Sequence, residues 1–139
     1  MKLYFSCSLT GGRQDQPMYA ALVKHMATLG HEVLTAHLAS AEVMAEEAVV
    51  DPVAVYQRDI GWVEACDAVI AEVSTPSHGV GYEVAYALER GKPVLCCYRA
   101  GARVSKMIIG NTTSGIMVRA YHDEAEAMGI LEEFLRPKP

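Results

Sequence analysis

The feature that most limits what this chain can fold into is a regular alternation of strand-like and helix-like segments. Short runs rich in Val, Ile, Leu, Tyr and Cys are separated by runs with apolar residues every three or four positions. The runs predict strands at residues 2–7, 31–36, 67–73, 92–98 and 115–121. They predict helices at residues 16–30, 51–66, 79–91 and 123–135, and shorter helical segments at 40–50 and 104–110.

Strands that are joined through helices indicate a parallel sheet covered on both faces. We therefore expect an α/β fold, a Rossmann-like (flavodoxin-like), doubly wound five-stranded parallel sheet with helices on both faces. The chain has 139 residues, 51% of them hydrophobic, which suits one domain over residues 1–139. Ligands of such sheets bind beyond the carboxyl ends of the strands. Candidate site residues are therefore expected just after the first and third strands.

The composition argues against several classes of function. The formal net charge is −5 and the lysines and arginines are scattered, so neither a nucleic acid nor an anionic membrane surface is an expected partner. No apolar run approaches the roughly 20 residues of a membrane helix, and the N-terminus lacks the pattern of a signal peptide. The cysteines show neither CxxC nor metal-ligand spacing and read as small core residues. We expect a reduced, cytoplasmic protein without a bound metal.

The loop after the first predicted strand, "SLTGGRQD" at residues 8–15, has the composition of an anion-binding loop. It offers hydroxyls, a Gly-Gly pair that permits close backbone approach, and a guanidinium suited to phosphate. Its candidate ligands are Ser8, Leu9, Thr10, Gly12 and Arg13. The same residues are also typical of a flexible turn, and GxxxxGK[ST] is absent.

The loop after the third predicted strand, "STPSHGVGYE" at residues 74–83, leads into a helix. Its glycines start a dinucleotide fingerprint, but position 84 is Val where the third glycine belongs, so a dinucleotide cofactor is not expected. Ser74, Thr75, Ser77 and the first helical amides suit an anion or a sugar hydroxyl. Glu83 has two interpretations. It either complements the helix dipole in the first turn or directs a carboxylate into the ligand cleft.

Asp59 and Tyr4 complete the set of candidates. Helical spacing places Asp59 inside the apolar stripe of residues 51–66, where a carboxylate is costly unless it is paired or has a function. It either bonds a backbone amide, or is turned outward by Arg58, or carries a proton that burial favours. Tyr4 lies on the first predicted strand, and by itself it is more typical of a core position than of a site.

Three segments of the sequence, taken together, resemble those of the 2'-deoxynucleoside 5'-phosphate N-hydrolases. They are "LYFSCSLTGGR", "RDIGWVEACDAVIAEVSTPSHGVGYEVAYA" and "RVSKMIIG". These enzymes belong to the wider nucleoside 2-deoxyribosyltransferase superfamily, and the resemblance covers nearly the whole chain. Its most specific part is the order of a first-strand Tyr, D-x-x-W, AEV and S-x-G-x-G-Y-E. The resemblance implies hydrolysis of the N-glycosidic bond of 2'-deoxynucleoside 5'-monophosphates to a free base and 2-deoxyribose 5-phosphate, with no cofactor.

The resemblance also implies a role for each matching residue. Glu83 corresponds to the nucleophile, Tyr4 to the tyrosine that orients it, and Asp59 to the second acid. The phosphate-binding positions correspond to Ser8, Ser77 and Gly79, with Ser105 reaching the phosphate of the neighbouring subunit in a homodimer. The chain departs from the family where it has Cys7 instead of a frequent Gly and Thr10 instead of a frequent Arg. Both departures leave the base and the sugar preference open.

Three other functions remain to be weighed. The transferase branch of the superfamily exchanges bases on unphosphorylated deoxynucleosides and resembles this chain less, because it has Asp where this chain has Ser77. Ser77 carries no charge and can donate to a phosphate, so this position favours a monophosphate substrate. A ribonucleoside monophosphate N-hydrolase and a non-catalytic nucleotide-binding domain are further alternatives.

Overall fold

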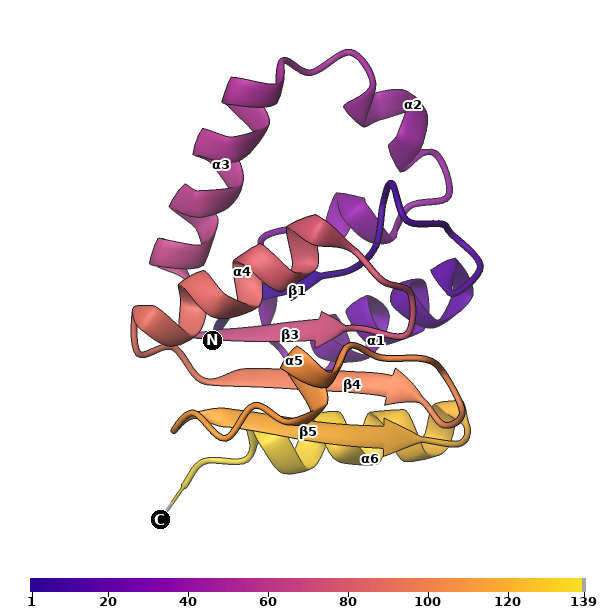
Figure 1. The fold of residues 1–139 in the computed structure, drawn as a ribbon, viewed down its shortest axis with the longest axis vertical. Coiled ribbons are helices and arrows are strands. Elements are labelled where there is room, and N and C mark those ends of the chain that lie inside the picture. The colour runs from indigo at the N-terminus through magenta and orange to yellow at the C-terminus, as the bar shows by residue number, and fades with distance from the viewer. Residues whose placement is uncertain (139) are drawn as a thin grey trace.

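The computed structural model describes residues 1–138 and contains one five-stranded sheet in which every neighbouring pair is parallel. The strand order is β2-β1-β3-β4-β5 (Figure 1). The strands are β1 (Lys2–Ser6), β2 (Glu32–Val33), β3 (Ala68–Glu72), β4 (Val94–Arg99) and β5 (Ile116–Tyr121). This arrangement confirms the predicted doubly wound α/β fold. It places the point where the strand order reverses between β1 and β3, which is where such sheets bind ligands.

Helices cover both faces of the sheet, with α1 and α6 on one side and α3 and α4 on the other (Figure 1). The helices are α1 (Gln16–Thr28), the 3-10 helix η1 (Ala36–Ala39), α2 (Val43–Glu47), α3 (Pro52–Ala65), α4 (His78–Glu89), α5 (Lys106–Ile109) and α6 (Glu124–Leu135). None of the helices in residues 1–138 is long and apolar enough to cross a membrane.

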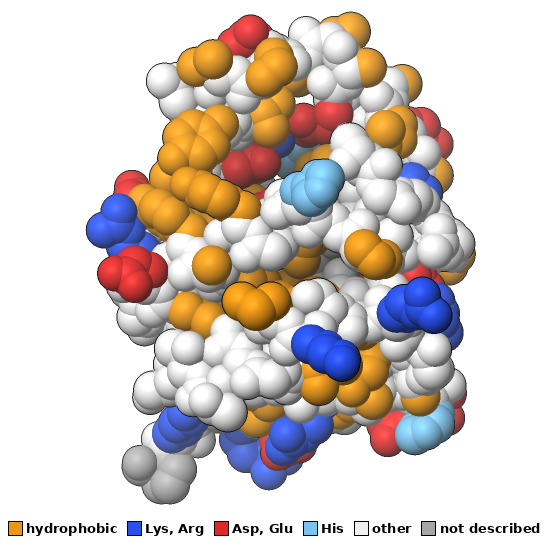
Figure 2. Space-filling model, in the orientation of Figure 1, with side chains coloured by type: hydrophobic (Ala, Val, Ile, Leu, Met, Phe, Trp, Pro, Cys, Tyr) orange, Lys and Arg blue, Asp and Glu red, His pale blue; other side chains and the backbone are white. Residues whose placement is uncertain are grey.

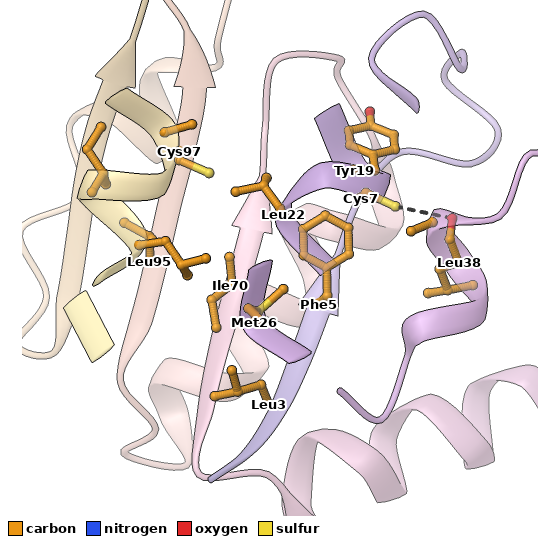
Figure 3. Close-up of a cluster of buried hydrophobic side chains, with 14 of the residues drawn as sticks. Leu3, Phe5, Cys7, Tyr19, Leu22, Met26, Leu38, Ile70, Leu95 and Cys97 are labelled. Carbon is orange, nitrogen blue, oxygen red and sulfur yellow. Dashed lines mark hydrogen bonds between the residues drawn. The ribbon is translucent and has the colours of Figure 1, made fainter. Parts of the chain in front are cut away.

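The sheet separates two hydrophobic cores, because successive side chains of a strand point to opposite faces. On the α1 and α6 side, Leu3 and Phe5 of β1 pack with Ile70 of β3 and with side chains of α1 (Figure 3). On the α3 and α4 side, Tyr4 of β1 packs with Val84 of α4. Successive residues of one strand therefore lie in different cores.

The second strand is shorter than the predicted segment 31–36, because the hydroxyl of Thr35 replaces a backbone partner. Thr35 is fully buried, and its Oγ1 accepts from the Phe5 amide at 2.8 Å and donates to the Phe5 carbonyl at 2.6 Å. With these groups of β1 occupied, the ladder ends at Val33 and the chain turns into η1. A side-chain bond of this kind is not visible in the hydrophobic pattern.

The helix predicted at residues 51–66 begins where the sequence indicates, whereas the segment before it differs from the prediction. Asp51 caps α3 by accepting from the Ala54 amide at 3.2 Å, and Pro52 occupies the first turn. The helix predicted at 40–50 is reduced to the five residues of α2, and Ser40 is not its cap. Instead, the hydroxyl of Ser40 bonds the backbone and carboxylate of Glu42.

The four cysteines are small core residues, as predicted. All four are free thiols and are buried. Burial raises the pKa of Cys7 and of Cys96 to about 12, so neither is an activated thiol. The Cys7 thiol donates toward the Leu38 carbonyl on the α1 side of the sheet (Figure 3).

Candidate active site

A cleft of about 490 Å³ opens where α2, α3, α4 and the loop after β1 meet. Figure 2 shows acidic side chains in the hollow between α3 and α2. The cleft brings together residues from four separate segments: Leu9, Thr10, Glu47, Val50, Pro52, Val55, Tyr56, Asp59, Ile60, Gly79, Tyr82 and Glu83. Two carboxylates that are distant in sequence, Asp59 and Glu83, thus line one cavity.

Glu83 reaches this cleft because of where α4 begins. The helix starts at His78, and Ser77 caps it by accepting from the Val80 amide at 3.3 Å. Glu83 is therefore in the second turn, so the interpretation of Glu83 as a first-turn complement to the helix dipole is wrong. Gly79 lies one turn before it, where a Cβ would stand 3.6 Å from Oε1 of Glu83.

The strongest sign of a ligand site is a set of buried polar atoms that have no partner. Tyr4 Oη, Ser6 Oγ, Ser8 Oγ and Glu83 Oε2 are all buried without a hydrogen bond that meets normal geometry. Tyr4 and Ser6 share one face of β1, directly below α4. Buried polar groups are nearly always bonded, so such a concentration indicates a site that is completed by a ligand.

The surroundings of Glu83 hold a proton on it near neutral pH. Burial raises the pKa of Glu83 to about 7, and the charge of Asp59 raises it further, whereas the approach of Tyr4 and Ser6 lowers it. Tyr4 and Ser6 thus act on the Glu83 carboxyl although neither forms a bond of normal geometry with it. Burial and the nearby charges of Glu83 and Asp59 raise the pKa of Tyr4 well above its usual range, so its hydroxyl stays protonated.

Asp59 is paired with Arg58, but it is not turned out of the cleft as one sequence interpretation had it. Its Oδ1 accepts from Arg58 Nε at 2.8 Å, and its side chain is 18% exposed while still lining the cleft. The Arg58 guanidinium also holds both carboxylate oxygens of Glu47, at 3.0 and 3.3 Å, and lies over the ring of Trp62. Arg58, which orients Asp59, is therefore itself held by Glu47 and by the ring of Trp62.

The loop after β1 is tightly packed against the loop after β3. A Cβ at Gly11 would lie 2.1 Å from the Pro76 carbonyl oxygen, and Gly12 has φ +128°, so glycine is required at both positions. Arg13 uses its guanidinium within the protein, where it donates to the carbonyls of Ser8, Leu38 and Ser40 at 2.8–3.2 Å. Of this loop, Leu9 and Thr10 line the cleft.

A second cavity of about 710 Å³ lies on the other side of the α4 N-terminus. Ser77 and Ser105 both line it, as do Thr10 and Tyr82, which also line the first cleft. Ser105 is exposed and caps the short helix α5 by accepting from the Met107 amide at 3.2 Å. The structure thus places Ser105 beside the N-terminus of α4, away from Asp59 and Glu83.

Sequence reasoning missed Ser6, Glu47 and the pair Tyr56 and Tyr82. Ser6 could have been found, because it follows Tyr4 by two positions and must share its face of the strand. Glu47 could not, because its contact with Arg58 depends on how α2 folds back against α3. The two tyrosines are half exposed at the cleft, with hydroxyls 3.2 Å apart. Residues 1–138 contain no cluster of three or more His, Cys, Asp or Glu suited to a metal ion.

Comparisons with known proteins show the family and the fold of the chain. A family model described as Nucleoside 2-deoxyribosyltransferase matches residues 3–129. A Methanococcoides burtonii protein named "Putative 2'-deoxynucleoside 5'-phosphate N-hydrolase 1" is 41% identical over 121 residues, covering 87% of this chain and 99% of that protein. Human 5-hydroxymethyl-dUMP N-hydrolase is 35% identical over 141 residues, covering 99% and 80%. The solved Clostridium botulinum CMP N-glycosidase shares the fold at TM-score 0.73 and 20% identity, covering 97% and 100%.

Proposed function

Because the chain belongs to the nucleoside 2-deoxyribosyltransferase family, we propose that it hydrolyses the N-glycosidic bond of 2'-deoxynucleoside 5'-monophosphates. The products are a free base and 2-deoxyribose 5-phosphate. The observation that carries the proposal is the buried, partly unpartnered carboxyl of Glu83 in one cleft with Asp59. Relatives that match most of the chain are named as N-hydrolases of deoxynucleotides, which supports the same reaction.

The proposed chemistry uses the two carboxylates in different roles. Cleavage builds positive charge on the anomeric carbon, and ionised Glu83 attacks that carbon to form a glycosyl ester. Asp59 assists the departing base, which takes up a proton from solvent in the cleft, and the water that later cleaves the ester returns one proton to solvent. Water then attacks the ester, releases 2-deoxyribose 5-phosphate and regenerates Glu83. Tyr4 orients the carboxylate from below, and the reaction requires neither a metal nor an organic cofactor.

The phosphate is proposed to bind where the loops after β1 and β3 meet the N-terminus of α4. Free amides at a helix N-terminus favour an anion, and Ser77 and Gly79 stand at that end of α4. From the loop after β1, Ser8, Leu9, Thr10 and Gly12 are proposed to contact the substrate. Arg13 is proposed to contribute positive charge while it stays bound to its three carbonyls.

A homodimer is proposed to complete each site, with Ser105 reaching the phosphate bound by the neighbouring subunit. Exposed apolar side chains follow Ser105 in α5: Met107 is 81% exposed and lines the second cavity, and Ile109 is 48% exposed. A second copy of the chain would cover this surface and bring in the hydroxyl of Ser105. A cytoplasmic location fits a nucleotide substrate and four free thiols.

The alternatives predict different substrates. A transferase would prefer unphosphorylated deoxynucleosides together with an acceptor base. A ribonucleotide hydrolase would accept the 2'-hydroxyl, and a binding domain would form no product. Incubation with a panel of deoxy- and ribonucleoside monophosphates and unphosphorylated deoxynucleosides, followed by detection of free base, separates these cases.

The residue assignment is tested with Glu83→Ala and Asp59→Asn. Each variant should lose nearly all turnover of its monophosphate substrate while remaining folded. Glu89→Gln is the matched control, because Glu89 lies on the same helix but is exposed and outside the cleft. Turnover at the wild-type level in either cleft variant would contradict the assignment.

A further inference from the structure

Glu72 is a buried carboxylate that the proposed mechanism does not use. It is the last residue of β3 and is 0% exposed. Its side chain lies on the α1 and α6 side of the sheet, as that of Ile70 does, because alternate residues of a strand share a face. The cleft of Glu83 opens on the opposite side. A carboxylate in such a place is costly unless its contacts are needed.

The contacts of Glu72 and Ser74 connect the ends of β3, β4 and β5 to the loop after β3. Its Oε1 accepts from the hydroxyl of Ser74, from the Ser74 amide at 3.3 Å and from Tyr121 Oη of β5 at 3.1 Å. The Ser74 hydroxyl in turn accepts from the Arg99 amide of β4 at 2.8 Å. One carboxylate oxygen thus anchors Ser74 to the carboxyl edge of the sheet.

The next residues of the loop are held from the same side. Thr75 Oγ1 donates to Asp15 Oδ2 at 3.1 Å, and Asp15 pairs with the Arg99 guanidinium at 3.2 Å. Ser74 and Thr75 are both buried. Ser77, the cap of α4, follows only two residues later. Ser77 therefore follows a segment that Glu72 and Asp15 hold from the α1 and α6 side of the sheet.

We propose, on the basis of the function proposed above, that Glu72 is a positioning residue for the phosphate end of the cleft. It fixes Ser74 and, through the buried segment 74–75, sets Ser77 and the first turn of α4, without touching the substrate.

The charges around Glu72 fit this role. Asp15 and Tyr19 of the α1 region, Cys97 of β4 and Tyr121 of β5 face it. Burial raises the pKa of Glu72 to about 7, the bonds from Ser74 and Tyr121 lower it, and the charge of Asp15 raises it. The other oxygen, Oε2, is buried without a partner, so only Oε1 makes the contacts that hold the loop.

Two substitutions of Glu72 separate positioning from simple packing. Glu72→Gln keeps an acceptor oxygen for Ser74 and Tyr121 and places its amide where Oε2 has no partner, so KM and kcat should stay within about twofold of wild type. Glu72→Leu fills the space but removes the acceptor. It should raise KM for the monophosphate about tenfold with kcat within about threefold, since a hydrogen bond to a charged group is lost.

Ser74→Ala is the second variant. It removes the hydroxyl that bonds Glu72 while keeping Glu72 itself. It also tests the proposal if Glu72→Leu does not fold. A raised KM with kcat nearly unchanged is expected here too. The proposal is overturned if the folded Leu and Ala variants both keep the wild-type KM, if they lose kcat at unchanged KM, or if Gln behaves like Leu.

Binding measurements distinguish this proposal from the function on which it rests. The Kd of each common deoxynucleoside 5'-monophosphate is measured by calorimetry in Glu83→Gln, with and without Glu72→Leu. A wild-type chain that binds but does not hydrolyse would refute the proposed reaction, and an approximately tenfold weaker Kd in the double variant would still support the role of Glu72. Equal Kd values, or no binding by the wild-type chain, would refute that role.

Discussion

At the scale of single residues, Glu83 lines the cleft with a partly buried carboxyl group, which must be ionised to act as a nucleophile. Burial holds its pKa at about 7, so the reactive form declines below that pH. We predict that kcat/KM rises about tenfold per pH unit below about 7 and levels off above it. The measurement is a pH–rate profile with a deoxynucleoside monophosphate.

A control is needed because two other groups titrate nearby. Burial also raises the pKa of Glu72 to about 7, and a phosphate monoester titrates near about 6. Glu72→Gln should keep the limb assigned to Glu83. A profile that is flat between pH 5.5 and 8, or a limb that disappears in Glu72→Gln, would contradict the assignment.

The same burial predicts a stability effect. The pKa of Glu83 is raised from 4.5 in a free side chain to about 7 in the native state, so the native state binds the extra proton between these values. The free energy of unfolding therefore falls as pH rises from about 4.5 to 7. Glu83→Gln removes this penalty, and its gain in stability should be about 2 kcal/mol larger at pH 8 than at pH 5.

Urea unfolding at the two pH values measures the difference. Exposed Glu89→Gln on the same helix should show little change at either pH. An equal gain for Glu83→Gln at both pH values would show that the carboxyl is not protonated in the native state.

At the scale of elements, local patterns could be predicted and long-range contacts could not. The start of α3 could be predicted, because Asp51 caps the helix and Pro52 occupies its first position, both within one turn. The short β2 was not, because its end depends on Thr35 meeting Phe5 across thirty residues. Tyr4, Asp59 and Glu83 were identified as candidates from their motifs. The contact of Arg58 with Glu47 and that of Glu72 with Tyr121 come from packing between elements, which no local spacing encodes.

The cap of α4 joins helix stability to substrate choice. Ser77→Asp keeps an acceptor for the Val80 amide and suits the helix dipole, so the melting temperature should change little. The added charge should repel a phosphate and lower kcat/KM for the monophosphate by about 100-fold. Activity assays with a deoxynucleoside and its monophosphate, beside thermal melts, test this.

Ser77→Ala separates the two effects. It loses the cap, which should cost about 1 kcal/mol of stability, but adds no charge. Its activity loss should be much smaller than that of the Asp variant. If Ala and Asp reduce monophosphate turnover equally, Ser77 does not lie near the phosphate.

At the scale of the whole molecule, the proposed dimer rests on the surface around α5. Met107→Asp would place a charge in a buried apolar contact and should yield a monomer in size-exclusion chromatography with light scattering. Val49→Asp is the matched control, because Val49 is 86% exposed and lines neither cavity. A monomeric wild-type chain, or a dimer that persists in Met107→Asp, would contradict this interface.

Sharing of sites between subunits makes a stronger prediction, because it can be tested by complementation. Ser105→Ala should raise KM for the monophosphate, while Glu83→Gln should be inactive. In a co-expressed heterodimer, the site with Glu83 from one chain would receive Ser105 from the other, so one site in two would be intact. Isolated heterodimers should therefore show the wild-type KM at about half the wild-type kcat per dimer. A heterodimer with the raised KM of Ser105→Ala would mean that Ser105 acts within its own subunit.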